Sequence, residues 1–367
     1  MSVKCERNCK SKGKDGNCSL KEIVISSMGV CNQYQEGPKF QPFCEDIVAV
    51  YDEAGIPSIM RRFKRMTNKE LFDGSDKPHP MFVVGGEVQD EIYISVYPNV
   101  IINGKAYSLP MQKPAVNVTL EEAEKACFTK GEGWHLMTAV ERGFLANLCY
   151  KHGTLPHGNT NYGKYHADHS EKGECFDGCK TLTGSGPATW NHDHTVFGVS
   201  DLCGNVWEWF RGLRLMDGVL QVAKDNDAAM NIDLSRESQN WQTMLADGKP
   251  ICIDATEGIR FTNNGEGIDG DGEYDGCEWE DVEFDFGRTE QMIELGLFPG
   301  EPKAYMYADT GDERLPICGG SWAGGAFAGV FDVSLSSPRS YSGSSVGFRS
   351  AFYRKLNTED CNLKGGC

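Results

Sequence analysis

The sequence predicts an α+β fold behind a small cysteine-rich N-terminal module, and three observations support this expectation. Runs in which β-branched and aromatic residues alternate with polar ones occur near residue 90 and again near residue 333, which is typical of strands. Helix-capping sequences occur near residues 119 and 138. Cysteines crowd the first 31 residues, among Lys, Gly and Asn.

Residues 1–37 are expected to form a separate module, because a segment with so few apolar residues needs covalent or metal bonds to hold it. Its thiols belong to Cys5, Cys9, Cys18 and Cys31. Four thiolates could bind zinc, although their spacing lacks the CxxC pairs of common zinc folds. Two disulfides and free thiols are the alternatives, and the chain's 15 cysteines, an odd number, cannot all pair within one molecule. The segment also resembles a small family of uncharacterised bacterial cysteine-rich domains, which implies no activity.

Length and charge exclude several function classes. A chain of 367 residues with 40% hydrophobic residues is long enough for a well-buried core. Its formal net charge of −17 repels phosphate backbones and anionic lipid head groups, so nucleic acid is not expected as a partner. The sequence starts without the apolar core of a signal peptide, and no run reaches the ~18 apolar residues of a membrane span. We therefore expect a protein made in the cytoplasm, without membrane insertion.

A helical connector is expected over residues 38–80. In "EDIVAVYDEAG" the apolar residues fall on one helical stripe, which Gly55 and Pro57 end. The following "IMRRFKRM" gathers the basic residues Arg61, Arg62, Lys64 and Arg65. A solvated helix face is the favoured interpretation, and contact with a polyanion or with an acidic patch of this protein is the alternative.

Strands and helices follow in turn. "HPMFVVGGEVQDEIYISVYPNV" is strand material. "TLEE" at Thr119 and "TAVE" at Thr138 are capping boxes, each followed by apolar residues at helical spacing, and Gly153 closes the second helix.

A loop-rich region from Gly153 to about Trp190 is rich in metal-binding residue types. In and beside it are His152, His157, His166, His169, His192 and His194, with Cys175 and Cys179. It contains no HExxH motif and no histidine pair at helical spacing. An ordered loop is therefore favoured over a catalytic metal site.

An acidic segment lies in residues 269–285. Its alternating acidic residues resemble the oxygen ligands of calcium, namely Asp269, Asp271, Glu273 and Asp275. The EF-hand pattern is incomplete. A solvated acidic loop is therefore favoured, with calcium binding left open.

The stretch "FGVSDLCGNVWEWFRGL", residues 197–213, completes a set of separated motifs. Gly204 and Asn205 predict a tight turn, and Val206, Trp207 and Trp209 predict buried strand surface. Together with "GWHLMTAVERG", "GTLPHGNTNYGK", "GGSW" and "VGFRSAF", it resembles the formylglycine-generating-enzyme type of C-type lectin fold over residues 81–353. The resemblance is closest to the variable proteins of diversity-generating retroelements, which phages and prophages often carry. Residues 354–367 would then be a C-terminal tail.

The enzymes that share this fold imply an alternative function, a cofactor-dependent oxidase of the sulfatase-modifying type. Formylglycine-generating enzymes carry a copper-binding cysteine pair shortly after the GGS motif, whereas here no cysteine follows Ser321 until Cys361. The HxxxExH-like histidine set of the iron-dependent sulfoxide synthases is not found either. We therefore expect a protein that is not an enzyme and needs no cofactor in its lectin-like domain, since a fold alone does not imply an activity.

The C-terminal stretch 319–352 combines a strict frame with loosely specified positions. Phe331, Val333 and Leu335 alternate with polar residues, so one strand face is expected to feed the core and the other to look outward. "SSPRS" predicts a turn, and Val346 and Phe348 begin a second buried edge. The frame residues are Gly319, Gly320, Trp322, Arg339, Gly347 and Arg349.

The remaining positions are those that the resemblance implies to be variable and ligand-binding. They are Ala323, Gly324, Phe327, Asp332, Ser334, Ser336, Ser337, Tyr341, Gly343, Ser344 and Ser345. In the retroelement family, the adenines of AAC codons are miscopied. Changes at the first two bases of AAC can never produce a codon for Lys, Glu, Gln, Met or Trp. None of these positions holds one of those residues.

The expected function is that of a receptor-recognition protein whose hypervariable lectin-fold surface binds a ligand without turnover. Rigid aromatic side chains bring contact area at low entropy cost, so Phe327 and Tyr341 are the expected anchors. The partner would be an unknown protein or cell-surface ligand. A homo-oligomer, and a final site on a virion or a cell surface, are left open.

Overall fold

The computed structural model describes residues 40–42, 46–52, 55–266, 268, 272–297 and 304–354. Two large sheets, three two-stranded ribbons and a small number of helices make up this part of the chain, so the predicted α+β class is confirmed. The N-terminal cysteines Cys5, Cys9, Cys18 and Cys31 and the tail after Arg354 lie outside the described residues.

The first sheet is antiparallel and brings the two ends of the described chain together. Its order is β1-β2-β3-β6-β24-β9. These strands are β1 (Phe40–Pro42), β2 (Ile47–Tyr51), β3 (Pro57–Lys64), β6 (Glu91–Ser95), β24 (Ser350–Tyr353) and β9 (Trp134–Leu136). The C-terminal strand β24 thus lies between β6 and β9, where Ala351 pairs with Ile94 on one side and His135 on the other.

The helical connector expected over residues 38–80 is wrong for most of its length. Residues 47–64 form the β2–β3 hairpin, turning at Gly55 (φ 73°), and only the short helix α1 (Asn68–Phe72) follows. A short apolar run such as "IVAVY" fits a helical stripe and a buried strand equally well, and pairing with β3, which in turn pairs with β6, decides for the strand. The first sheet therefore continues across the boundary expected at residue 81.

The second sheet has the order β18-β20-β22-β21-β11-β12-β16-β17-β19. Its strands are β18 (Tyr274–Glu278), β20 (Tyr305–Asp309), β22 (Val333–Ser337), β21 (Glu313–Cys318), β11 (Leu213–Met216), β12 (Val219–Ala223), β16 (Cys252–Asp254), β17 (Arg260–Thr262) and β19 (Glu283–Phe284). Branching from it are β10 (Trp207–Trp209), β13 (Trp241–Thr243) and β23 (Val346–Phe348). Three two-stranded ribbons complete the strands: β4 (Val83–Val84) with β5 (Glu87–Val88), β7 (Val100–Ile102) with β8 (Lys105–Tyr107), and β14 (Leu245–Ala246) with β15 (Lys249–Pro250).

Both predicted capping boxes begin helices. Thr119 starts α2 (Leu120–Phe128) and Thr138 starts α3 (Ala139–His152), each exchanging hydrogen bonds with the Glu three residues on. Gly153, with φ 64°, ends α3 in the left-handed conformation that favours glycine. A short fourth helix, α4 (Glu290–Glu294), packs near α3.

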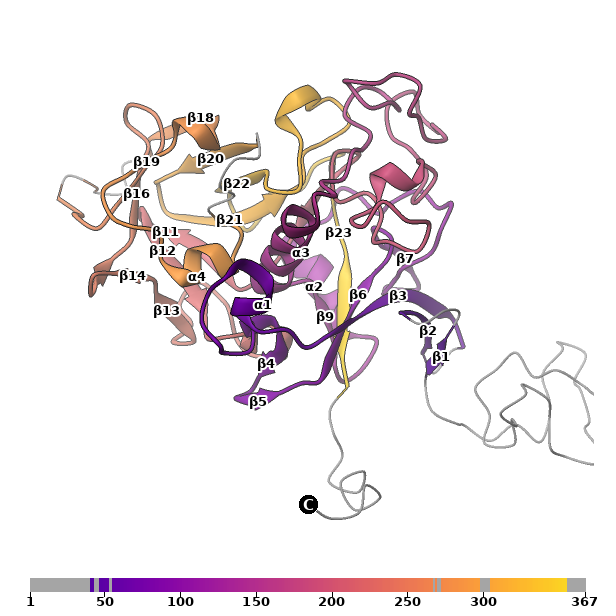
Figure 1. Ribbon diagram of the computed structural model, residues 1–367, viewed down its shortest axis with the longest axis horizontal. Helices are drawn as coiled ribbons and strands as arrows, with labels where there is room; N and C mark the ends of the chain where they lie inside the picture. Colours follow the sequence, from indigo (N-terminus) through magenta and orange to yellow (C-terminus); the bar gives the residue numbers. More distant parts are fainter. Residues whose placement is uncertain are drawn as a thin grey trace, which may run out of the picture.

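Helix α3 lies at the centre of the molecule in Figure 1, and its close approach to α4 depends on Gly143. A Cβ on Gly143 would lie 2.1 Å from the Glu294 carbonyl oxygen, so only glycine fits there. Phe144, one residue on, is fully buried and meets the rings of Phe63 and Phe82 edge-on. These contacts join the two sheets through one core.

Within the described residues, no helix is long and apolar enough to cross a membrane.

Candidate ligand-binding surface

The motifs that are separated in the sequence meet around one buried ion pair. Arg349 of "VGFRSAF" makes a bidentate pair with Glu208 of "VWEWF", with both N–O distances at 2.7 Å. The same guanidinium donates to the carbonyls of Ser95 and Ser200 at 2.9 Å, and Arg349 is fully buried. A buried pair with all its hydrogen bonds made is strongly disrupted when one partner is lost, so these two residues fix the frame.

A second junction ties the loops to the frame. Asn205, with φ 61°, donates its N–H to the Asn159 carbonyl at 2.7 Å and accepts from the Trp322 N–H at 3.1 Å. Gly204 donates to the Gly319 carbonyl at 2.8 Å, so the predicted turn is confirmed. The "GNVW", "HGNTN" and "GGSW" motifs are therefore held together by backbone hydrogen bonds that do not depend on variable side chains.

In residues 319–352 the apolar residues that alternation places toward the core are buried, as predicted. Phe331, Val333 and Leu335 are at most 3% exposed. Val346 and Phe348 are fully buried, on the strand β23 that pairs with β10.

The outward half of the predicted alternation is wrong for Asp332 and Ser334, which are 1% and 5% exposed. Ser337, predicted to be a variable position, is buried as well, at 6% exposed. Ser334 pairs in parallel with Tyr307 of β20, so the two side chains share the outer face of the sheet. Tyr307 is itself only partly exposed, and the centroid of its ring lies 6.4 Å from that of Trp207. An aromatic layer from other segments thus covers the strand face that alternation alone assigns to solvent.

Asp332 is buried for a different reason, because it lies under the "GG" turn. Its carbonyl accepts from the Gly319 N–H at 3.0 Å, and a Cβ on Gly320 would lie 2.9 Å from its Oδ2. Burial raises the pKa of the Asp332 carboxyl well above its ordinary value, and the charge of Arg142 opposes this. Asp332 is therefore a core residue and does not contact a ligand on the surface.

The exposed variable positions occupy the two turns that flank β22. In the first turn Phe327 is 47% exposed and Ala323 is also exposed. In the second turn Tyr341 is 39% exposed, with Ser344 exposed beside it. The positions of intermediate exposure are Gly324, Ser336, Gly343 and Ser345.

Fixed aromatic residues continue the surface beyond the variable positions. The ring centroids of Phe327 and Tyr305 lie 4.5 Å apart, and those of Tyr305 and Tyr307 lie 5.0 Å apart. The ring of Tyr307 packs in turn near that of Trp207. We call these residues, Phe327, Tyr305, Tyr307 and Trp207, the aromatic row. Sequence reasoning missed Tyr305 and Tyr307, although the alternation in "YMYAD" of β20 was a visible signal, because nothing local shows that β20 pairs with β22.

Trp322 differs from the expectation that it belongs to the core frame. It is only partly buried, and its ring meets Tyr162 at 5.0 Å, a residue that is itself 58% exposed. The backbone of Trp322 still serves the frame, since its carbonyl accepts from the Tyr162 N–H at 2.9 Å. Its side chain therefore belongs to the surface beside the first turn.

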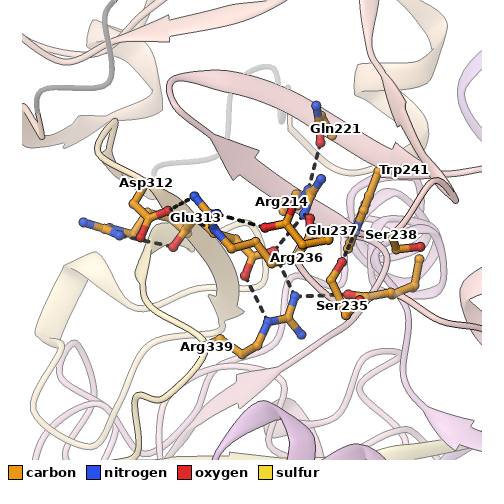
Figure 2. A network of polar contacts seen from close by, with 12 residues as sticks. Arg214, Gln221, Ser235, Arg236, Glu237, Ser238, Trp241, Asp312, Glu313 and Arg339 are labelled. Carbon is orange, nitrogen blue, oxygen red and sulfur yellow. Dashed lines mark hydrogen bonds and ion pairs between the residues drawn. The ribbon is translucent and has the colours of Figure 1, made fainter.

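A charged network anchors the second turn (Figure 2). Arg339 makes a bidentate pair with Glu313 at 2.8 and 2.9 Å, and Arg214 donates to the same carboxylate at 2.9 Å. Arg214 also lies over the ring of Trp241, 4.4 Å from its centroid. Arg339 thus holds the start of the turn that presents Tyr341, whose ring rests 6.3 Å from buried Trp209.

The histidine-rich loop is ordered by internal contacts. His157 bonds to Glu171 at 2.9 Å and stacks on Tyr165 at 4.1 Å, and the Trp190 indole donates to the same Glu171 at 3.1 Å. Among the described residues no group of three or more His, Cys, Asp or Glu side chains could hold a metal ion. Cys175 and Cys179 sit in a small turn with no disulfide between them.

The acidic segment is described only in part. Asp269 and Asp271 lie outside the described residues, and Glu273 is exposed. Asp275 accepts from the backbone N–H groups of Gly258 and Gly276, which is a structural use of its carboxylate.

Comparison with known proteins gives structural likenesses only. No family profile and no curated protein matches the sequence. Similar solved structures include PvdO from Pseudomonas aeruginosa, with 13% identity, a TM-score of 0.33 and coverage of 87% of this chain and 99% of that chain. Treponema denticola variable protein 1 follows, with 14% identity, a TM-score of 0.32 and coverage of 85% and 99%. The Major Tropism Determinant I1 variant has 12% identity, a TM-score of 0.32 and coverage of 96% and 80%.

These proteins are of the two kinds that the sequence resemblance names, retroelement variable proteins and a protein of the formylglycine-generating-enzyme-like fold. At such TM-scores the likeness carries no weight for function, which has to come from this chain's own residues.

Proposed function

We propose that this protein binds a ligand without turning it over, through a C-terminal surface that a retroelement diversifies. One observation carries the proposal: within 319–352 most of the frame is buried and hydrogen-bonded to other segments of the fold, whereas Phe327 and Tyr341 are exposed on turns. Exposed side chains on a fixed backbone can be exchanged at little cost in stability. The fold therefore tolerates variation where a ligand would be met.

The proposed contact positions are those of the two turns and the partly exposed Ser336 of β22, with Tyr305, Tyr307 and Trp207 of the aromatic row as constant neighbours. They are Ala323, Gly324, Phe327, Ser336, Tyr341, Gly343, Ser344 and Ser345. Rigid aromatic rings add contact area at low entropy cost, and small Ser and Gly neighbours adapt to different partners. An unknown protein or cell-surface ligand, met from a virion or a cell surface, is the proposed partner.

Diversification is tested by sequencing codons 300–352 in a passaged population of cells that carry the gene. We expect substitutions at adenines, gathered in the codons of the exposed positions, with the codons of Phe348 and Arg349 unchanged. A near-copy of codons 319–352 beside a reverse-transcriptase gene is the matching genomic observation. Substitutions spread evenly over codons 300–352 would contradict the proposal.

Binding capacity is tested with two display libraries of the full chain, each selected against hen egg lysozyme as a defined probe protein. The first library randomises exposed positions: Ala323, Phe327, Tyr341 and Ser344. The matched control randomises buried ones: Ala328, Asp332, Ser334 and Ser337. We expect folded display and lysozyme binders from the first and loss of folded display from the second. A first library that stays folded but yields no binder argues against a binding surface here.

The absence of catalysis is part of the proposal. It is supported by the lack of a cysteine between Ser321 and Cys361, where related oxidases hold copper. Stoichiometric binding of copper or iron together with oxygen consumption on a thiol substrate would establish the oxidase alternative.

We also propose that Cys5, Cys9, Cys18 and Cys31 bind zinc in a separable module. The support is their crowding in a polar segment that cannot build its own core. Metal analysis of the purified chain should find one zinc ion. A zinc-free protein in which all four thiols are freely alkylated would rule this out.

A further inference from the structure

A cavity of about 510 Å³ lies between β3, the C-terminal half of α3 and the loop at His192. Its size falls within the usual ~300–1,000 Å³ of small-molecule sites. The lining shares no residue with the aromatic row or with the variable positions. This cavity is therefore a separate feature of the molecule.

One wall of the cavity is apolar. Phe63 and Phe144 meet edge-on at 5.7 Å, and Met66 and Leu148 extend the same wall. Phe63 and Phe144 are core residues, at 7% and 0% exposed, so they form a fixed base behind this wall. Met66 and Leu148 are partly exposed and supply its accessible surface. It offers contact to a hydrocarbon group of several carbon atoms.

The rest of the lining is charged, with an excess of cations. Arg61, Arg62 and Lys64 line it against two carboxylates, Asp46 and Asp193. In a chain of net charge −17, this is a local reversal of sign. It favours an anion over a cation as the ligand.

The guanidinium of Arg61 is poorly satisfied by the protein. Its Nη2 lies 3.8 Å from Asp46 and 3.5 Å from Asp193, well beyond the ~2.7–2.9 Å of a good charged hydrogen bond. Its Nη1 donates to the Phe197 carbonyl at 3.2 Å, and its buried Nε has no hydrogen-bond partner among the described residues. A carboxylate placed in the cavity would give Arg61 the short contacts that it lacks.

His192 supplies a neutral hydrogen-bond donor near Arg61. Its Nδ1 accepts from the Val199 N–H at 2.8 Å, which leaves the ring proton on Nε2. Burial lowers the pKa of His192 to about 4, so the ring stays neutral near pH 7. The ring is held edge-on to Phe63 at 5.6 Å and is 3% exposed, so its orientation is set before a ligand arrives.

We propose that this cavity binds a small organic carboxylate with an apolar body. The carboxylate would sit between Arg61 and His192, and the body would lie against Met66 and Leu148. Inorganic anions match only the charged wall and neutral hydrocarbons only the apolar one, so a molecule that carries both groups fits best.

The test uses the full chain and three probes, octanoate, 1-octanol and acetate, with binding measured by calorimetry. We expect octanoate to bind at least about tenfold more tightly than either of the others, because only octanoate uses both walls. The substitution Arg61→Gln should weaken octanoate binding about tenfold or more. Arg236→Gln, at an exposed arginine paired with Asp312, is the matched control and should leave it unchanged.

Octanol binding as tight as octanoate would overturn the proposal, as would no octanoate binding at millimolar concentration. If Arg61→Gln does not fold, the comparison of the three probes on the unchanged protein still decides. None of these outcomes bears on the surface at Phe327 and Tyr341, so the two proposals stand or fall separately.

Discussion

Two neighbouring parts of the C-terminal stretch, residues 328–337 and residues 338–345, are both rich in serine but occupy opposite environments. Ser334 and Ser337 of the first are 5% and 6% exposed, whereas Ser344 of the second is exposed. The first part is a strand between β20 and β21, and the second is a turn held at Arg339. Similar composition therefore tells little about which serines meet solvent.

The difference shows what alternation along a strand can and cannot predict. Period 2 correctly separates Val333 and Leu335 from Ser334 and Ser336. Whether the second face meets solvent depends on the next strand, where Tyr307 stands beside Ser334. A turn has no such neighbour, so Tyr341 stays exposed.

The largest expected effect tests the frame. Phe348→Ala should cost about 3–5 kcal/mol of unfolding free energy, since Phe348 is fully buried and the truncation leaves a cavity. Urea unfolding followed by fluorescence measures it. A cost below about 1 kcal/mol would mean that β23 is not part of the core.

A matched pair of lysine substitutions compares the two parts directly. Ser334→Lys should cost about 1–3 kcal/mol, because the longer side chain has to displace the tyrosine layer. Ser344→Lys, on the exposed turn, should change the unfolding free energy by under about 0.5 kcal/mol. Equal costs in thermal or urea unfolding would show that the two serines share one environment.

Asp332 gives a smaller, pH-dependent effect. Its folded pKa is raised, so above about pH 4, the ordinary value, the unfolded chain releases a proton that the folded chain keeps. This makes the unfolding free energy fall as pH rises toward the folded pKa. Asp332→Asn removes this pH-dependent loss of stability, so the melting temperature of the variant should lie a few degrees above that of the unchanged protein at neutral pH. The difference in melting temperature should be smaller near pH 4. A gap that is constant with pH would show that the carboxyl does not titrate abnormally.

The smallest effect is expected at the surface. Replacing Phe327 and Tyr341 by Ser should leave the melting temperature within a few degrees, because exposed substitutions usually cost under about 0.5 kcal/mol each. In a chain selected to bind lysozyme, replacing the residues selected at positions 327 and 341 by Ser should abolish binding. If this pair unfolds the protein as severely as Phe348→Ala, both rings are core and the proposed surface does not exist.

Much of the frame could be predicted from the sequence because its signals are local. The capping boxes at Thr119 and Thr138 and the left-handed turn at Asn205 involve residues within a few positions of one another. The candidate surface was predicted only in part. Phe327 and Tyr341 are exposed as expected, but Asp332 is not, and Tyr305 and Tyr307 were missed.

The sequence by itself determined the α+β class, the start of both long helices and the inward face at Phe331, Val333 and Leu335. Each of these depends on capping or on side-chain period, which act over less than about two turns of chain. Only the tertiary structure decided that residues 47–51 and 57–64 are strands, that Ser334 is covered and that a cavity forms beside Arg61. Those features depend on segments far apart in the sequence: β3 is a strand because it pairs with β6, and Ser334 is buried because Tyr307 lies beside it. Burial is a property of the neighbours that folding brings together, and no local pattern names them.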